Sequence, residues 1–166
     1  KFEWNDQCFQ AFENLKQKLI SAPILAFPIN QKPFEIQCDA SNVGIGAILL
    51  QNDTQNVERV IAYSSRLLNS AEKNYSATEK ECLAVIHALK VFRCYVEGTK
   101  ITVLTDHNAL KWLMNIKDPS GRLARWALEI QNFDLVIEYK KGKNNKDADA
   151  LSRDIPQVNM IHTTES

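Results

Sequence analysis

The sequence lacks the features that mark membrane, secreted and strongly basic proteins. No apolar run approaches the roughly 18 to 20 residues that cross a bilayer, and the N-terminus, KFEWNDQCFQ, lacks the charged-then-apolar layout of a signal peptide. We therefore expect a soluble protein. The 20 basic and 20 acidic side chains leave zero net charge, which argues against a polyanion binder held by overall positive charge. Any nucleic-acid role must depend on a local patch.

Motifs for several kinds of chemistry are also missing. The four cysteines include no CxxC pair, the three histidines form no HxxxH or HExxH pair, and neither GxxxxGK[ST] nor GxSxG occurs. These absences disfavour zinc, P-loop and serine-hydrolase chemistry. The cysteine spacing favours reduced, intracellular core cysteines over a disulfide framework.

What is present is one domain's worth of protein with an uneven charge distribution. A chain of 166 residues buries roughly 70% of its unfolded surface, so it can form a core without disulfides or zinc. Residues 1–84 carry 8 basic and 10 acidic side chains, whereas residues 85–146 carry 11 and 6, a local charge of +5. The later half is therefore the better candidate for contacts with phosphates.

Helical spacing of apolar residues predicts a first helix that ends before Pro23. Its stripe consists of Cys8, Phe12, Leu15 and Leu19, and we expect that stripe to serve in packing. Residues 21–33 contain three prolines and predict an extended connector.

Three strands should follow as an antiparallel meander. Residues 34–38 alternate between apolar and polar, which indicates a half-buried strand, and Asp39 should point away from its apolar side. Residues 43–50, VGIGAILL, are apolar at both odd-numbered and even-numbered positions, as in a strand buried on both faces. Residues 57–64 supply the third strand, joined by a polar hairpin connection.

The remaining elements alternate between helices and strands. Ser76 and Glu79 have capping-box spacing ahead of a long helix that should stop at Gly98. After it we expect a short buried strand at 101–105 and two short helices at 109–115 and 123–130. An alternating strand at 133–139, a basic loop at 140–146 and a terminal helix that ends near 153 should follow. This order predicts an α/β domain with a mixed sheet.

Four carboxylates occupy positions where a solvated charge is not the simplest explanation. They are Asp39 and Asp106 at strand ends, Glu81 beside the apolar stripe of the long helix, and Asp149 in the last helix. Ligands bind in α/β proteins beside strand ends, and carboxylates are the usual protein ligands of Mg²⁺. Two such ions about 3.5 to 4 Å apart could activate water and stabilise the leaving oxygen in phosphodiester cleavage.

Each carboxylate also has a structural interpretation. Aspartates often form turns at strand ends, and an early helical glutamate interacts favourably with the helix dipole. Asp147 competes with Asp149, because residues two apart on a helix face nearly opposite sides.

Several segments together closely resemble the ribonuclease H domain of gypsy-type LTR retrotransposon Pol polyproteins. They are FEIQCDASNVGIGAILLQ, IAYSSRLLNSAEKNYSATEKECLAVIHALKVFRCYVEG, ITVLTDHNALKWL and YKKGKNNKDADALSR, and the opening FEWNDQCFQAFENLKQKLISAPILAFP resembles the end of the preceding reverse transcriptase. The resemblance implies a reverse transcriptase end and linker at 1–33, a ribonuclease H domain at 34–154, and a linker or disordered tail at 155–166.

The resemblance also implies a fold, a site and a reaction. The fold is a five-stranded mixed sheet of order 3-2-1-4-5 flanked by helices. Asp39, Glu81, Asp106 and Asp149 match the four metal-binding carboxylates, and Asp149 is preferred because it lies four residues after Asn145. The reaction is hydrolysis of the RNA strand of an RNA/DNA hybrid, with two Mg²⁺ ions that Mn²⁺ can replace. The partner is the reverse transcriptase of the same polyprotein, in the cytoplasm within virus-like particles.

One departure from the wider ribonuclease H group concerns a histidine in the loop before the last carboxylate. This chain has Lys141, Gly142, Lys143, Asn144 and Asn145 there. Gypsy-type elements commonly lack the histidine too, so its absence does not argue for a dead enzyme, although turnover should be slower or depend on another loop residue.

Proteins distinguish an RNA/DNA hybrid by groove shape and 2′-hydroxyls, so polar residues beside the carboxylates are candidate substrate contacts. These are Ser41, Asn42, Ser76, Thr78 and Asn108, joined by Arg122, Arg125 and Lys143 for phosphates, with Lys111, Lys140, Lys141 and Lys146 as further basic candidates. Ser76 could equally be a helix cap. Trp112 and Trp126 fit core positions better than base-stacking ones.

Two non-enzymatic interpretations remain open. One is a catalytically retired ribonuclease H-like tether, and the other is a domesticated nucleic-acid-binding module. The presence of all four carboxylates favours the active enzyme over the tether.

Overall fold

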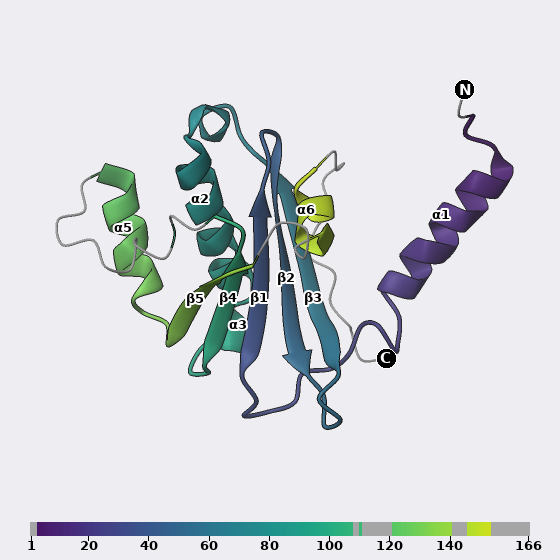
Figure 1. Cartoon of the computed structure of the whole chain (residues 1–166), viewed down its shortest axis with the longest axis horizontal. Helices are drawn as coiled ribbons and strands as arrows, with labels where there is room; N and C mark the ends of the chain where they lie inside the picture. The colour runs from purple at the N-terminus through teal and green to yellow at the C-terminus, as the bar shows by residue number, and fades with distance from the viewer. Residues whose placement is uncertain (1–2, 108–109, 111–120, 141–145, 154–166) are drawn as a thin grey trace.

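The computed structural model describes residues 3–107, 110, 121–140 and 146–153. They form a five-stranded sheet in the order β3-β2-β1-β4-β5, with helices packed against it (Figure 1). The strands are β1 (Phe34–Ala40), β2 (Gly44–Asn52), β3 (Glu58–Leu67), β4 (Ile101–Thr105) and β5 (Leu135–Tyr139). The helices are α1 (Asp6–Leu19), η1 (Glu72–Asn74), α2 (Ala77–Val91), α3 (Arg93–Val96), α5 (Gly121–Ile130) and α6 (Lys146–Ser152).

The sheet is mixed, as the sequence predicts. β1, β2 and β3 form the expected antiparallel meander, while β4 pairs in parallel with both β1 and β5. The strand order therefore confirms the predicted 3-2-1-4-5 arrangement. The fold class inferred from the sequence is confirmed with it.

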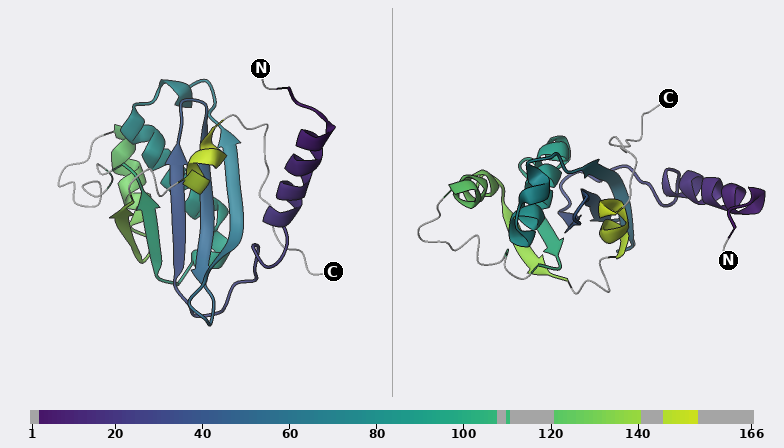
Figure 2. Two further views of the ribbon diagram at one scale, coloured as in Figure 1. Left: turned by 45° about the vertical axis from the view of Figure 1, so that its right-hand side comes forward. Right: turned by 90° about the horizontal axis from the view of Figure 1, so that it is seen from above.

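The expectation that β1 is half-buried is wrong. β1 is the central strand and lies between helices on both faces, so the polar residues Gln37 and Asp39 are as buried as the apolar ones between them. α2 and α6 contact both β1 and β2, and they lie on opposite sides of the sheet (Figure 2). Alternation of residue type thus identified the strand but not its surroundings, because α6 comes from more than 100 residues later in the chain.

The hydrophobic core lies mainly between the sheet and α2. Cys38 and Ile36 of β1 face Cys82, Val85 and other apolar residues of α2 in one continuous cluster. Ser76 and Glu79 form the predicted capping box at the start of α2. The helix ends at Val91, one turn of α3 follows Phe92, and Gly98 has the left-handed φ of 76° that favours glycine after a helix.

α1 is a helix, as predicted, but its apolar stripe does not pack within this chain. No residue of α1 is buried, and Phe9, Phe12, Leu15 and Leu19 are all exposed. The helix projects away from the sheet (Figure 1). The connector does pack: Leu25 is buried, and Ala26 donates its N–H to the Val60 carbonyl of β3 at 2.8 Å.

Several sequence-based expectations lie wholly or partly outside the described residues. They concern the helix at 109–115, the basic loop at 140–146, of which only the ends are described, the tail after Arg153, and the side chains of Asn108, Lys111, Trp112, Lys141, Lys143 and Lys146. In the described part of the chain, Cys38 and Cys82 are buried, whereas Cys94 is exposed, so only two cysteines fit the predicted core role. No helix in the same residues is long and apolar enough to cross a membrane.

Candidate active site

The site begins where the parallel strands β1 and β4 stop pairing. Their last paired residues are Gln37 and Leu104. The same register, continued by two residues, sets Asp39 opposite Asp106. The two carboxylates therefore lie at the carboxyl ends of neighbouring parallel strands, which is the usual ligand position in α/β folds.

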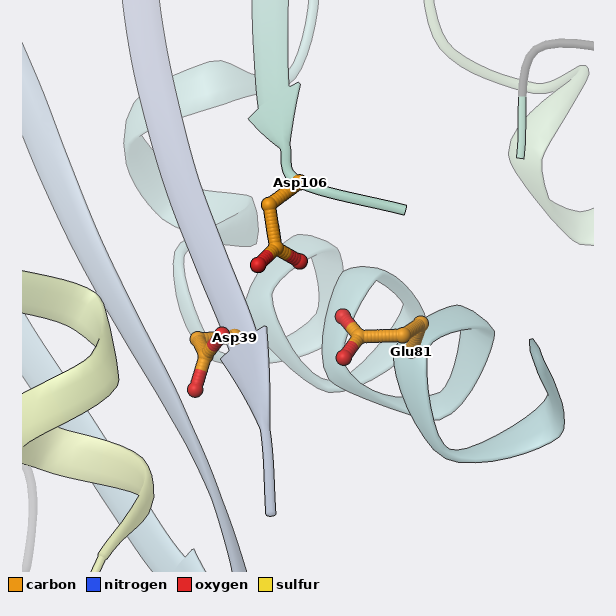
Figure 3. Close-up of side chains that lie close together, drawn as sticks. All are labelled: Asp39, Glu81 and Asp106. Atoms are coloured by element: carbon orange, nitrogen blue, oxygen red, sulfur yellow. The ribbon is translucent and has the colours of Figure 1, made fainter. Parts of the chain in front are cut away.

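Glu81 completes a cluster of three carboxylates. It comes from the second turn of α2, and one carboxylate oxygen from each of Asp39, Glu81 and Asp106 lies within 4.8 Å of the others. Figure 3 shows the three side chains converging from β1, α2 and the end of β4. Such a set of oxygen donors suits a hard divalent cation.

Glu81 is the carboxylate for which the metal-free site is least favourable. Burial raises the pKa of its carboxyl to about 8, with further contributions from the charges of Asp39 and Asp106, and the backbone N–H of Ala40 opposes the shift. Its Oε2 is buried without a hydrogen-bond partner among the described residues. A cation in the cluster would supply both a partner and a compensating charge.

Asp39 is held by α6. The Ser152 hydroxyl donates to Asp39 Oδ2, and its oxygen also lies 2.9 Å from the Asp149 carbonyl oxygen. Burial raises the pKa of Asp39, the Ser152 hydrogen bond opposes that shift, and the charges of Asp106 and Asp149 add to it. The carboxylate is therefore held in position, and the charge of Arg153 compensates only part of the effect of burial on its pKa.

Asp149 lies near the cluster but is not one of its three members. Its carboxylate pairs with Arg153, at 2.6 Å from one guanidinium nitrogen and 2.7 Å from Nε. Burial is the main cause of the raised pKa values of Glu58 and Tyr63, and the charge of Asp147 contributes to both. Asp147 and Asp149 thus act on different neighbours, as their spacing predicts, and Asp149 is the one beside Asp39.

α6 reaches this position because β2 has a glycine beneath it. A Cβ at Gly46 would lie 2.7 Å from Leu151 Cβ and 2.8 Å from the Ala148 carbonyl oxygen. Gly46 pairs with Asp39 in the β1–β2 register, so both residues face α6. The close approach of helix and sheet brings Asp149 and Ser152 to the carboxylate cluster.

The polar residues predicted to contact the substrate differ in whether their side chains already make hydrogen bonds within the protein. The Ser41 hydroxyl accepts from Val43 N and Gly44 N and donates to the Ser152 carbonyl, so it holds the loop after β1. The Ser76 hydroxyl serves the capping box, and Thr78 Oγ1 bonds His107 Nε2 at 2.9 Å. Asn42 is exposed in the same loop.

The two described arginines in the predicted set also differ. Arg122 pairs with Glu79 at 2.6 Å and stacks over the Tyr75 ring, 3.7 Å from its centroid, so it joins α5 to α2. Arg125 is exposed. Trp126 packs against the core, as predicted.

Sequence reasoning missed two residues that hold the site. Ser152 lies three residues after Asp149, a spacing that places both on one helix face, and this signal could have identified it. Lys80 precedes Glu81 directly and donates to Asn42 Oδ1 at 3.2 Å. Nothing in its spacing distinguishes it from a solvated lysine.

Comparisons with known proteins agree with this geometry. Residues 30–133 match the family described as the RNase H-like domain found in reverse transcriptase. The retrovirus-related Pol polyprotein from transposon 297 of Drosophila melanogaster is 45% identical over 144 residues, which are 87% of this chain and 13% of that polyprotein. The chain thus spans a small part of such relatives.

Solved structures show the same fold. A foamy viral protease-reverse transcriptase in complex with RNA/DNA hybrid aligns with a TM-score of 0.60 and 18% identity, over 99% of this chain and 22% of that one. RNase H1 from the halophilic archaeon Halobacterium salinarum aligns with a TM-score of 0.54 and 18% identity, over 72% of this chain and 93% of that one. The solved structures show the fold, and the match over residues 30–133 shows that this chain belongs to the family of RNase H-like domains found in reverse transcriptase, with relatives among retrotransposon Pol polyproteins.

Proposed function

We propose that this domain is a metal-dependent endonuclease that hydrolyses the RNA strand of RNA/DNA hybrids during reverse transcription. The observation that carries the proposal is the convergence of Asp39, Glu81 and Asp106, with one buried oxygen of Glu81 unpartnered among the described residues. A surface cluster of acids would not need to bury a carboxylate in this way.

The donor set fits divalent cations. Asp39, Glu81 and Asp106 would hold them, and we include Asp149 as the fourth ligand, which requires it to exchange its ion pair with Arg153 for the metal. Two bound Mg²⁺ or Mn²⁺ ions would supply an activated water and stabilise the leaving oxygen. Ser152 would hold the Asp39 carboxylate in position throughout.

The partner that we propose is the reverse transcriptase of the same polyprotein. The exposed apolar face of α1, formed by Phe9, Phe12, Leu15 and Leu19, supports this partner, because exposed apolar patches of this kind mark interaction sites. The polyprotein relatives have chain beyond the part that matches this one, and we propose that an equivalent segment covers this face.

Cleavage of a labelled hybrid tests the proposal. The protein should cut the RNA strand with Mg²⁺ or Mn²⁺ and stop when the metal is chelated. Asp106→Asn keeps the side-chain volume but removes a charged ligand, so we expect at least a hundredfold loss of rate. Metal-independent cleavage, or equal rates for the two proteins, would contradict the proposal.

The tether and the binding module make a different prediction in the same assay. Either of them would bind the hybrid or the polymerase without cutting the RNA strand at any metal concentration. The convergence of the three carboxylates favours the enzyme, because a retired domain has no need to maintain their mutual repulsion.

A further inference from the structure

Lys80 occupies a position that ordinary helix chemistry does not favour. It lies in the first turn of α2, where the positive end of the helix dipole opposes a cation, and its side chain is only 8% exposed. Buried lysines are nearly always ion paired, yet no carboxylate in the described part of the chain lies within ion-pair distance of Lys80. A residue placed against these preferences indicates a functional requirement.

The contact that Lys80 makes is with the loop that follows Asp39. Its Nζ donates to Asn42 Oδ1 at 3.2 Å, and the neighbouring Glu81 carboxylate accepts from the backbone N–H of Ala40. Two successive residues of α2 therefore contact the last residue of β1 and the loop that directly follows it. Glu81 belongs to the carboxylate cluster, so the loop is fixed relative to that cluster.

The chemistry of lysine decides how the Asn42 carboxamide is oriented. An ammonium group has three donors and no acceptor, so it can bond only the amide oxygen. The amide nitrogen Nδ2 must then point away from Lys80. Asn42 is exposed, and no described residue accepts a hydrogen bond from its Nδ2.

The rest of the loop offers no comparable group. The Ser41 hydroxyl is occupied by Val43 N, Gly44 N and the Ser152 carbonyl. Asn42 Nδ2 is therefore the free side-chain donor of this loop, and it lies three residues from a metal-binding aspartate.

We propose that Lys80 is a positioning residue, which fixes the Asn42 amide so that Nδ2 donates to an oxygen of the bound nucleic-acid strand. This inference rests on the proposed function. The acceptor is either a ribose 2′-hydroxyl or a phosphate oxygen, since both accept from an amide N–H. Without the ammonium the carboxamide is free to rotate, and the donor is no longer aimed at the strand.

Binding to the hybrid, measured in the Asp106→Asn protein, tests this inference apart from catalysis. Lys80→Met preserves most of the apolar volume and should weaken hybrid affinity about fivefold to tenfold, the loss of one hydrogen bond. Asn42→Ala should weaken affinity by a similar factor, and the double variant should be no weaker than either single one. Multiplicative losses, or wild-type affinity for Lys80→Met, would overturn the proposal.

Two further variants guard against a purely structural effect. Lys80→Arg keeps a charged donor and should restore affinity to within about twofold. Asn42→Asp keeps an oxygen acceptor for Lys80 but has no amide donor and adds a charge that repels phosphates, so it should lose at least as much affinity as Asn42→Ala even if Lys80→Met does not fold. Wild-type affinity for Asn42→Asp would overturn the proposal.

A DNA duplex of the same sequence identifies the acceptor. If Nδ2 contacts a 2′-hydroxyl, Lys80→Met should weaken binding to the hybrid but not to the DNA duplex, and if it contacts a phosphate, both affinities should fall equally. Failure of wild-type cleavage would count against the proposed nuclease, whereas these affinities bear on Lys80 alone.

Discussion

At the scale of single residues, the site combines charges that oppose one another. Asp39, Glu81 and Asp106 lie together with no basic side chain inside the cluster of described carboxylates, and burial raises the pKa of both Asp39 and Glu81. Among the described residues, the Ser152 hydroxyl and the Ala40 N–H donate to these two groups. Such a site is costly when empty and favourable when it holds a cation.

The raised pKa of Glu81 predicts how stability depends on pH without metal. The unfolded carboxyl ionises near 4.5, whereas the folded one keeps its proton up to about pH 8. The folded state therefore binds the extra proton in this interval, and its contribution to stability, complete below pH 4.5, is lost as pH rises towards 8. Glu81→Gln should remove this dependence and, at pH 8, melt about 4–8 °C higher than wild type, or roughly 2 kcal/mol for a domain of this size.

Thermal unfolding in chelator and in Mg²⁺ checks this prediction. At pH 5 the two proteins should melt within about a degree of each other, and Mg²⁺ should raise the melting temperature of wild type more than that of Glu81→Gln at pH 8. If the melting temperatures of the two proteins in chelator were equal at every pH between 5 and 8, the pKa of the Glu81 carboxyl could not be raised as described.

At the scale of elements, the contact between α6 and β2 decides whether the site forms. Gly46 is in contact with Leu151 and the Ala148 carbonyl, and α6 carries Ser152 and Asp149 towards Asp39. Any side chain at position 46 must displace the helix, because it would meet backbone atoms and the base of a side chain.

Gly46→Ala should therefore lower both stability and activity. Overpacking of this kind costs about 1–3 kcal/mol, and we expect cleavage to fall at least tenfold because Asp149 and Ser152 move with the helix. Gly44→Ala is the graded control, since its Cβ would lie 3.0 Å from the carbonyl oxygens of Arg66 and Ser152, and it should cost less in both measurements. A Gly46→Ala protein with wild-type activity would show that α6 does not position the site.

Local sequence signals predicted the elements better than their surroundings. Capping and strand residues act on their own backbone, so the signals they give are local. Examples are the capping box of Ser76 and Glu79, the glycine at position 98 after the helical segment, and the strand at Ile101–Thr105. The burial of Asp39 was not predictable in this way, since it depends on α6. The strand predicted over 133–139 is shorter, at Leu135–Tyr139, and only Ile137 is buried in it.

At the scale of the whole molecule, the chain has a folded domain and a helix that makes no core contact. α1 has no buried residue, whereas the connector after it adds Leu25 to the core and bonds the edge of β3. The connector therefore stabilises the ribonuclease H domain, and α1 does not.

Two truncations should separate these roles. Removing residues 1–20 should change the free energy of unfolding by no more than about 0.5 kcal/mol, because the removed side chains are not buried. Removing residues 1–27 should cost about 2–4 kcal/mol, and Leu25→Ala in the full chain should account for most of that loss. Urea unfolding of the two truncated proteins and of Leu25→Ala measures these changes in the free energy of unfolding. A large loss on removing α1 alone would mean that the helix packs against the domain.

The neutral net charge is also a property of the whole molecule. The chain has 20 acidic and 20 basic side chains, but three of the acids are concentrated in one cluster, in which Asp39 and Glu81 are buried and Asp106 is partly buried. Zero net charge therefore does not argue against a nucleic-acid enzyme, because cations bound by the acids would leave the basic side chains in excess.

The sequence by itself determined the order and type of most elements, and its resemblance to a known family supplied the strand order and the four candidate carboxylates. Periodicity, capping and turn chemistry act over a few residues, and the motifs that carry the family resemblance are contiguous. Only the tertiary structure decided that Asp39 meets Asp106 across the β1–β4 register, that Ser152 holds Asp39, and that Lys80 orients Asn42. Those contacts join elements that are distant in the chain, and side chains meet across such distances only when the sheet register and the helix packing place them together.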